Sequence, residues 1–359
     1  MSSPSRLPLP ETLSSVLILI LLAVAALLWT LAPEFYYRIS QEDGPLEWAT
    51  FWAFLLAALL AFGAIPGRPS GGAPWRTLYL AAFGIGCLAV AAEEISWGQR
   101  LFTYRPPELF LADNFQQELN LHNLADTSTR KAMLTGLLIG FGVLFPLLGQ
   151  VPSVAHWFRQ QEVPAPAPAI IPGFVALALL YLAYPMESTG EWVEAGTGLG
   201  FLLPAVGYLG RLRTAWLPAV GSLPILLGIL TPPLLAGTPD PTKIDLAMVE
   251  ASALAQDVKA RRLRSRCGVH KRLYTFVEEF GSGDLSRGAW GQLEDTDDET
   301  SARRQYFLDP WNLPYWIRHA CRDGRPTAIY VYSFGPNRRR DSSARGIQPD
   351  DVGSYASRP

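Results

Sequence analysis

Long apolar runs separated by short polar breaks dominate the first two thirds of the chain. Pro, Gly and charged residues mark the breaks, as in the sequence Gly67-Arg68-Pro69. About 20 apolar residues in a helix cover the ~30 Å hydrocarbon core of a bilayer. The pattern therefore predicts a polytopic α-helical membrane region of about seven transmembrane helices within residues 1–237. The expected spans are 12–32, 47–65, 75–96, 132–150, 168–186, 191–210 and 215–236.

The pattern changes after residue 237, where polar positions alternate with shorter apolar groups. Apolar residues recur near helical spacing over 243–266, at Ile244, Met248, Leu254 and Val258. Residues 328–334 instead alternate β-branched and aromatic side chains, which is typical of a strand. We therefore expect a small, water-soluble α+β domain over residues 238–359.

Composition and charge agree with this division. Hydrophobic residues make up 49% of the chain and charged residues 17%, against about 25% charged residues in ordinary soluble domains. Of the 30 Lys and Arg, 11 fall in residues 1–237 and 19 in residues 238–359. With the N-terminus in the cytoplasm, six of these cations flank the spans on the inner side and five on the outer side. This bias favours a C-terminal domain outside the cytoplasm, and that location argues against nucleic-acid binding.

Acidic residues gather at the predicted outer ends of the spans, and four residues there are candidates for chemistry. Glu93 and Glu94 end the third span, and Glu118 and His122 lie in the long loop that follows. If that loop is helical, Glu118 and His122 are one turn apart on one face. Carboxylates with a histidine suit a divalent metal, and a metal-bound water can attack a substrate. We therefore expect one of the two glutamates to lie near His122, under the loop.

A structural interpretation of the same residues stays open. Glu93 or Glu94 is then paired with Arg100, and Glu118 and His122 brace a surface helix. Charges at a membrane boundary are costly unless they are paired, hydrated or used. The sequence does not decide between a catalytic and a structural cluster, so whether the chain is an enzyme is left open.

Three short motifs follow the helix 243–266: D-P-W-N-L-P-Y at 309–315, V-Y-S-F-G-P-N at 331–337, and D-D-V at 350–352. In this order they make the C-terminal third resemble the globular domain of the major pseudopilin of type II secretion systems. The resemblance implies a pseudopilin-like, helix-first α+β fold in the periplasm, on a protein of the bacterial inner membrane. It also leads us to expect Trp311, Tyr315, Tyr330 and Tyr332 to pack against the helix. The family has one N-terminal span with a cleaved leader, and this chain departs from that pattern.

The resemblance further implies a calcium site near the C-terminus, with a plain polar surface loop as the alternative. The matching positions are Asn337, Asp341, Asp350 and Asp351, and calcium is bound by several oxygen ligands. The arginines at 338–340 would oppose a cation there. A periplasmic location would also permit a disulfide between Cys267 and Cys321; two unpaired thiols are the alternative.

Two functional hypotheses follow from the sequence. In the first, the chain is an integral inner-membrane protein that presents a periplasmic pseudopilin-like domain for interaction or scaffolding, with a role related to secretion. Its partners are then the lipid bilayer and other envelope proteins. In the second, it is a membrane-embedded metal-dependent hydrolase with an outer-face site made from the four candidate residues.

Overall fold

The computed structural model describes residues 9–66, 74–114, 116–209, 216–260, 270–280, 285, 288–293, 303–322, 325–339 and 351–357. The chain divides into two compact units. The first, here called the helical unit, comprises Met1–Trp97 and Ala125–Pro232. The second, called the mixed unit, comprises Gly98–Leu124 and Pro233–Pro359. The sequence placed 98–124 with the membrane region, but the structure joins this loop to the C-terminal segment.

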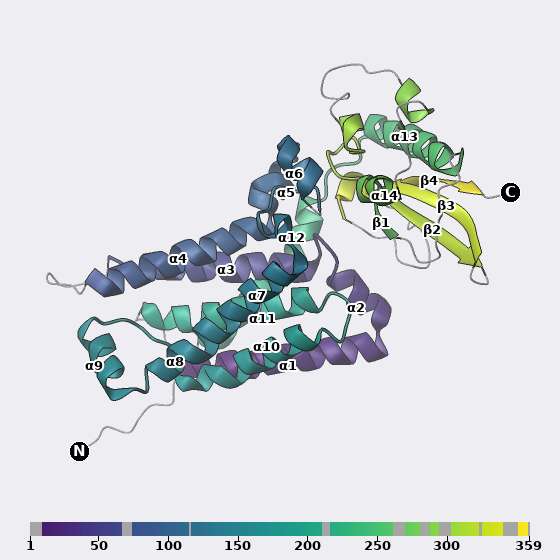
Figure 1. Ribbon diagram of the computed structural model, residues 1–359. Helices are drawn as coiled ribbons and strands as arrows, with labels where there is room; N and C mark the ends of the chain where they lie inside the picture. Colours follow the sequence, from purple (N-terminus) through teal and green to yellow (C-terminus); the bar gives the residue numbers. More distant parts are fainter. Residues whose placement is uncertain are drawn as a thin grey trace. The chain divides into compact units, whose positions relative to one another are not determined.

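Seven long helices run along the described part of the helical unit, and each lies within a few residues of a predicted span (Figure 1). Five are long and apolar enough to cross a membrane: α1 (Leu9–Leu31), α3 (Pro45–Gly63), α4 (Pro74–Glu94), the continuous run of α7, η3 and α8 (Thr127–Leu148), and α12 (Leu217–Leu235). The other two are α10 (Ile171–Ala183) and α11 (Thr189–Tyr208). Helix α10 belongs to an apolar helical run, Pro168–Ala183, that is shorter than the five candidate spans. Short helices α2 (Pro33–Ile39) and α9 (Pro152–Gln160) complete this unit.

Helix α11 forms the centre of the helical unit and is buried over most of its length. Small residues make this possible, since they let helix backbones approach closely. A Cβ added at Gly198 would lie only 2.9 Å from the Cβ of Ala53 on α3. Around α11, the rings of Phe83, Phe141 and Phe174 pack against Phe201, with 4.0 Å between the centroids of Phe141 and Phe201. The mixture of glycines and aromatic rings thus fills the core without charged groups.

One end of the helical unit, the tyrosine end, is defined by Tyr79 and Tyr208. The hydroxyls of these residues are 2.9 Å apart and join the start of α4 to the end of α11. At the same end of α4, Arg76 donates to the carbonyl of Ala64, just after α3. The hydroxyl of Ser15 donates to the carbonyl of Ala169, which joins the starts of α1 and α10.

The opposite end, the acidic end, contains Glu94, Glu191 and Glu194. These carboxylates, at the end of α4 and the start of α11, lie close enough for their charges to interact. Lys131, near the start of α7, lies 5.1 Å from the ring centroid of Tyr184, just after α10. Trp52 of α3 donates to Thr231 near the end of α12. Consecutive long helices therefore alternate in direction between the two ends.

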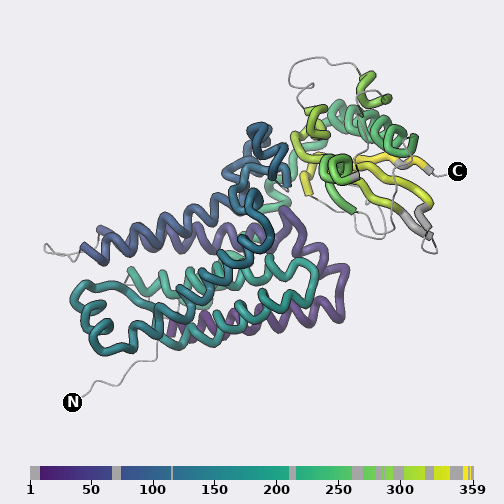
Figure 2. The backbone as a smooth tube through the Cα atoms, in the orientation of Figure 1, coloured from purple at the N-terminus to yellow at the C-terminus, as the bar shows by residue number. Residues whose placement is uncertain are grey.

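The mixed unit contains helix α13 (Pro241–Ala260) and a four-stranded antiparallel sheet in the order β1-β2-β3-β4 (Figure 2). The strands are β1 (His270–Arg272), β2 (Trp316–Arg322), β3 (Arg325–Ser333) and β4 (Val352–Ser357). Helix α14 (Leu273–Phe280) follows β1. The order is a simple meander, with Val331 of β3 opposite Ile317 of β2 and Ser354 of β4. The α+β class and the strand near 328–334 are thus confirmed.

Helix α13 covers one face of this sheet, and the register of β3 decides which aromatic residues reach it. Ile329 and Val331 pack in the core with Leu254 and Val258 of α13. Alternate residues of a strand point to opposite faces, so Tyr330 and Tyr332 face away from the helix, and their predicted packing against it is wrong. Tyr332 packs instead with Leu313, Trp316 and Phe334.

The predicted contacts of Trp311 and Tyr315 with the helix are confirmed, since Trp311 packs on Ala247 and Tyr315 lies in the core with Leu254. The apolar stripe expected along the helix is only partly correct. Met248 is 45% exposed, because the face that packs on the sheet is formed by alanines and leucine together with a buried glutamate, Glu250.

Candidate functional site

The four candidate residues for catalysis are divided between the two units. Glu93 and Glu94 end α4 in the helical unit, whereas Glu118 and His122 belong to the mixed unit. Glu93 accepts a 2.5 Å hydrogen bond from the indole nitrogen of Trp97. Glu94 faces the charges of Glu191 and Glu194. Arg100 forms an ion pair with Glu118, and its predicted pairing with Glu93 or Glu94 stays a prediction.

The loop that carries Glu118 and His122 is not α-helical there, so their expected helical spacing is wrong. Bends precede a short 3-10 turn at His122–Leu124, and His122 is exposed. The physical reason is the loop's amide side chains, which bond to the backbone and compete with a helix. Asn114 accepts from the backbone N–H of Gln116, and Gln99 accepts from that of Leu119.

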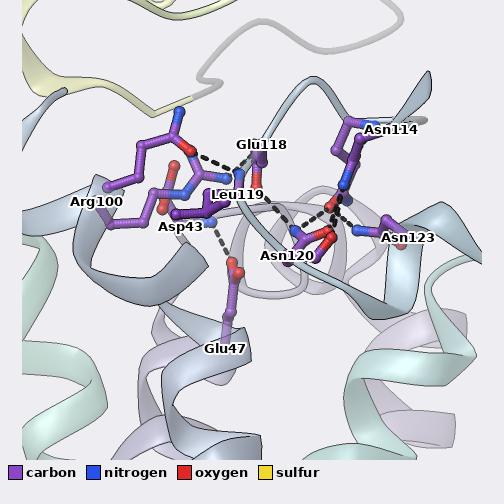
Figure 3. A network of polar contacts seen from close by, with 10 residues as sticks. Asp43, Glu47, Arg100, Asn114, Glu118, Leu119, Asn120 and Asn123 are labelled. Carbon is purple, nitrogen blue, oxygen red and sulfur yellow. Dashed lines mark hydrogen bonds and ion pairs between the residues drawn. The ribbon is translucent and has the colours of Figure 1, made fainter. Parts of the chain in front are cut away.

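A buried polar network holds this loop together (Figure 3). Nη2 of Arg100 lies 2.5 Å from Oε1 of Glu118, and both side chains are more than nine-tenths buried. The second carboxylate oxygen of Glu118 accepts from Asn120 at 3.4 Å. Asn114 in turn donates to the backbone and side-chain oxygens of Asn120, at 2.8 Å each. Buried polar groups need hydrogen-bond partners, and these partners fix the conformation of the loop.

The same loop is bonded to the C-terminal segment. Nε2 of Gln117 donates to the carbonyl of Tyr306 at 3.1 Å, and the hydroxyl of Tyr306 donates to Glu108 at 2.7 Å. Asn312 donates to the carbonyl of Thr103 at 3.2 Å. Leu111, in the short helix α6 (Glu108–Asp113), is buried against Tyr306 and Leu308. These contacts make residues 98–124 a structural part of the mixed unit.

A second buried network, which sequence reasoning missed, lies between α13 and the sheet. Glu250 is fully buried and pairs with Arg303 at 3.1 Å. The hydroxyl of Tyr315 donates to the other oxygen of Glu250 at 2.7 Å. Arg303 also donates to the carbonyl of Leu308 at 2.9 Å. The carboxylate is therefore held by donors from two different parts of the domain, which tie α13 to the turn before β2.

Asp309 organises that turn from inside. Oδ1 accepts from the backbone N–H groups of Trp311 and Leu313, at 2.8 and 2.9 Å, and Oδ2 accepts from the hydroxyl of Ser333 at 2.5 Å. Burial raises the pKa of Asp309 to about 6, although these hydrogen bonds and the charge of Arg303 lower it. The D-P-W-N-L-P-Y segment therefore has a structural explanation as a turn built around one carboxylate.

We expect the free energy of unfolding of the mixed unit to fall as the pH rises from about 4 to about 6. The folded state holds the proton of Asp309 more tightly than the unfolded chain, in which the ordinary pKa is 3.8. The tighter proton binding stabilises the folded state fully below the pKa of Asp309 in the unfolded chain. This stabilisation, up to about 3 kcal/mol, is lost as the pH rises through the pKa of Asp309 in the folded protein. Hydrogen exchange of the full chain at several pH values measures this slope. The Asp309→Asn variant should lose it, and an unchanged slope in that variant would assign the pH dependence to another group.

The expected calcium ligands lie only partly within the described residues. The side chain of Asn337 accepts from the backbone N–H of Arg339 at 3.0 Å, and Asp351 is buried just before β4. Asp341 and Asp350 lie outside the part of the chain that the structure describes. The same holds for Cys267 and for the side chain of Cys321, so calcium binding and the disulfide stay predictions. Cys87 is a buried free thiol in α4.

No group of three or more His, Cys, Asp or Glu side chains within the described ranges could hold a metal ion. The four candidate residues belong to two different units, so the metal-bound water of the predicted outer-face site stays a prediction. The buried polar residues of the mixed unit hold a loop and a turn in place. Comparison with family models, curated proteins and solved structures found no match for this chain.

Proposed function

We propose that this chain is an integral protein of the bacterial inner membrane that presents its mixed unit in the periplasm for interaction or scaffolding. The observation that carries the proposal is the composite origin of the mixed unit. Its loop 98–124 connects α4 to α7, and its longer segment continues from α12. Three chain connections therefore attach one folded domain to the membrane helices, which suits a domain held at the membrane surface better than one on a single tether.

The same observation supports an odd number of membrane crossings, which is five with the candidate spans alone and seven when α10 and α11 also cross; we propose seven. Because the two segments of the mixed unit bond to each other, the end of α4, the start of α7 and the end of α12 must face the same side of the membrane. Four long helices lead from the start of α7 to the end of α12, and an even number of crossings returns the chain to the side on which it began. The contacts at the acidic and tyrosine ends agree with α10 and α11 as two of these crossings.

The orientation of the proposal rests on charge. In the sequence, the segments that precede or join helices at the tyrosine end contain six Lys and Arg residues, and those at the acidic end contain five, which favours the tyrosine end as the cytoplasmic one. A periplasmic reporter enzyme fused after Ser354 should then be active. Activity only from a cytoplasmic reporter at the same position would reverse the orientation and place the mixed unit in the cytoplasm.

The interaction role is tested by photo-crosslinking in intact cells. A photoreactive amino acid is placed at Gln256 or Glu278, which are exposed in the mixed unit, and at Leu226 of α12 as a lipid-facing control. We expect discrete protein adducts at one or both exposed positions and none at Leu226. If neither position, nor any other exposed position of the mixed unit, gives a protein adduct, the scaffolding role is contradicted. A role related to secretion would require such an adduct to contain a secretion component.

A further inference from the structure

The exposed large apolar side chains of the mixed unit are unevenly distributed. Among its described residues beyond α12, they fall only in the loop 98–124 and in the first half of α13. They comprise Leu101, Phe102, Leu109, Leu121, Leu124, Leu246, Met248 and Val249. From residue 250 onward, no described residue has an exposed large apolar side chain. A domain surrounded by water on every side has no reason to confine such residues to two segments.

These two segments are the ones that adjoin the membrane helices. The loop follows α4 and leads into α7, and α13 begins at Pro241, shortly after α12 ends at Leu235. On α13, Leu246 and Val249 are spaced three residues apart, so they share one face of the helix. Phe102 in the loop is 75% exposed and Val249 is 53% exposed. Apolar and aromatic residues of this kind are enriched where a protein meets the headgroup region of a bilayer.

We propose that the mixed unit has a lipid-contacting surface, formed by the loop 98–124 and the first half of α13, which rests in the headgroup and outer acyl region of the membrane. The inference rests on the proposed membrane placement of the chain. Removing leucine and phenylalanine side chains from water is favourable, so several such residues together keep the domain against the bilayer. The three chain connections then position the mixed unit, and the apolar side chains keep it in contact with the bilayer.

The test uses the full chain in vesicles of phosphatidylcholine and phosphatidylglycerol with or without brominated phosphatidylcholine. An environment-sensitive fluorescent amino acid is introduced by codon suppression at Phe102, Leu246 or Val249. Gln256, exposed on the same helix α13, is the matched control, and Leu226 of α12, 54% exposed, is the control for a membrane-spanning position. All of these side chains are exposed, so the substitutions do not disturb a core.

We expect bromine to quench the fluorophore at Phe102, Leu246 and Val249 roughly twofold more than at Gln256, because these sites enter the acyl boundary. Quenching at Leu226 without quenching at the other three would overturn the lipid contact and leave the membrane placement intact. Absence of quenching at Leu226 as well would contradict the membrane placement itself. Emission that is blue-shifted but not quenched would show that protein, either the helical unit or a second copy, covers the surface, and would also overturn the proposal.

Discussion

Replacing Arg303 with alanine is expected to lower the free energy of unfolding of the mixed unit by about 3–5 kcal/mol, because it leaves the carboxylate of Glu250 buried without its cation. Glu250 is fully buried and Arg303 is 5% exposed, so the carboxylate lies away from bulk solvent when its cation is removed. The expected loss is a large fraction of the stability of an ordinary domain. Hydrogen exchange of the full chain in nanodiscs measures it, through the amides of α13 and β3.

Two variants show whether the effect comes from the unpaired charge. The triple change Glu250→Leu, Arg303→Met and Tyr315→Phe removes the charges and the hydroxyl together, and should restore most of the stability, since apolar residues of similar volume often replace a buried pair without loss. Glu279→Ala breaks the exposed pair of Lys271 and Glu279 and should cost less than about 1 kcal/mol. An Arg303→Ala effect as small as that of Glu279→Ala would show that the buried pair is not important for the domain.

The second large effect is expected in the loop. Glu118→Ala leaves the guanidinium of Arg100 buried, since both side chains of that pair are more than nine-tenths buried. The loss of about 3 kcal/mol should open the loop and speed exchange of its protected amides roughly a hundredfold. The backbone N–H of Leu119, which donates to Gln99, is a suitable reporter. Local opening would leave the amides of α11 in the helical unit unchanged.

Glu118→Gln is the matched control for that prediction. It keeps the shape of the side chain and one oxygen for Arg100, so it should cost less than Glu118→Ala but still weaken the pair. If both variants leave the exchange of Leu119 unchanged, the Arg100–Glu118 pair does not hold the loop. If both instead unfold the helical unit, the loop is not the independent part of the mixed unit that its contacts indicate.

The long apolar helices could be located from the sequence because a run of about 20 apolar residues, the length that crosses a bilayer, is a continuous signal. The expected span 75–96 corresponds to α4 at Pro74–Glu94, and 215–236 corresponds to α12 at Leu217–Leu235. Helix α9 was missed because it is short and polar on one side. The π-helical segment Gly140–Leu144 was missed for another reason: it leaves the apolar pattern unchanged.

The candidate site was harder to predict, because charge patterns do not state which residues meet. Glu118 and His122 have helical spacing, but the neighbouring asparagines and glutamines favour turns over a helix. The pairing of Arg100 with Glu118 depends on that turn. The sequence does contain a sign of the buried pair of Glu250 and Arg303. Glu250 lies on the same face of its helix as Ala247, Ala251 and Leu254, a face that is otherwise apolar. A charged residue on an otherwise apolar face predicts a buried partner.

The aromatic residues near the C-terminus show a similar limit. The pattern at 328–334 correctly predicted a strand, yet alternation alone does not say which of its faces meets the helix. That choice depends on Ile317 and Ala356 of the neighbouring strands, which share the core with Ile329 and Val331. The sequence therefore predicted the secondary structure of this part. The packing of Tyr330 and Tyr332 depends on the strand register, which the sequence pattern does not give.

The loop 98–124 and the C-terminal segment form one unit, and we propose that both lie on the same side of the membrane. The most direct measurement is labelling of intact spheroplasts with a membrane-impermeant thiol reagent, using Asp113→Cys in the loop and Gln256→Cys in α13, with the unsubstituted chain as background. Both positions are exposed. We predict that both variants are labelled in intact spheroplasts and that permeabilisation adds little. Labelling of one variant in intact spheroplasts and of the other only after permeabilisation would contradict the claim.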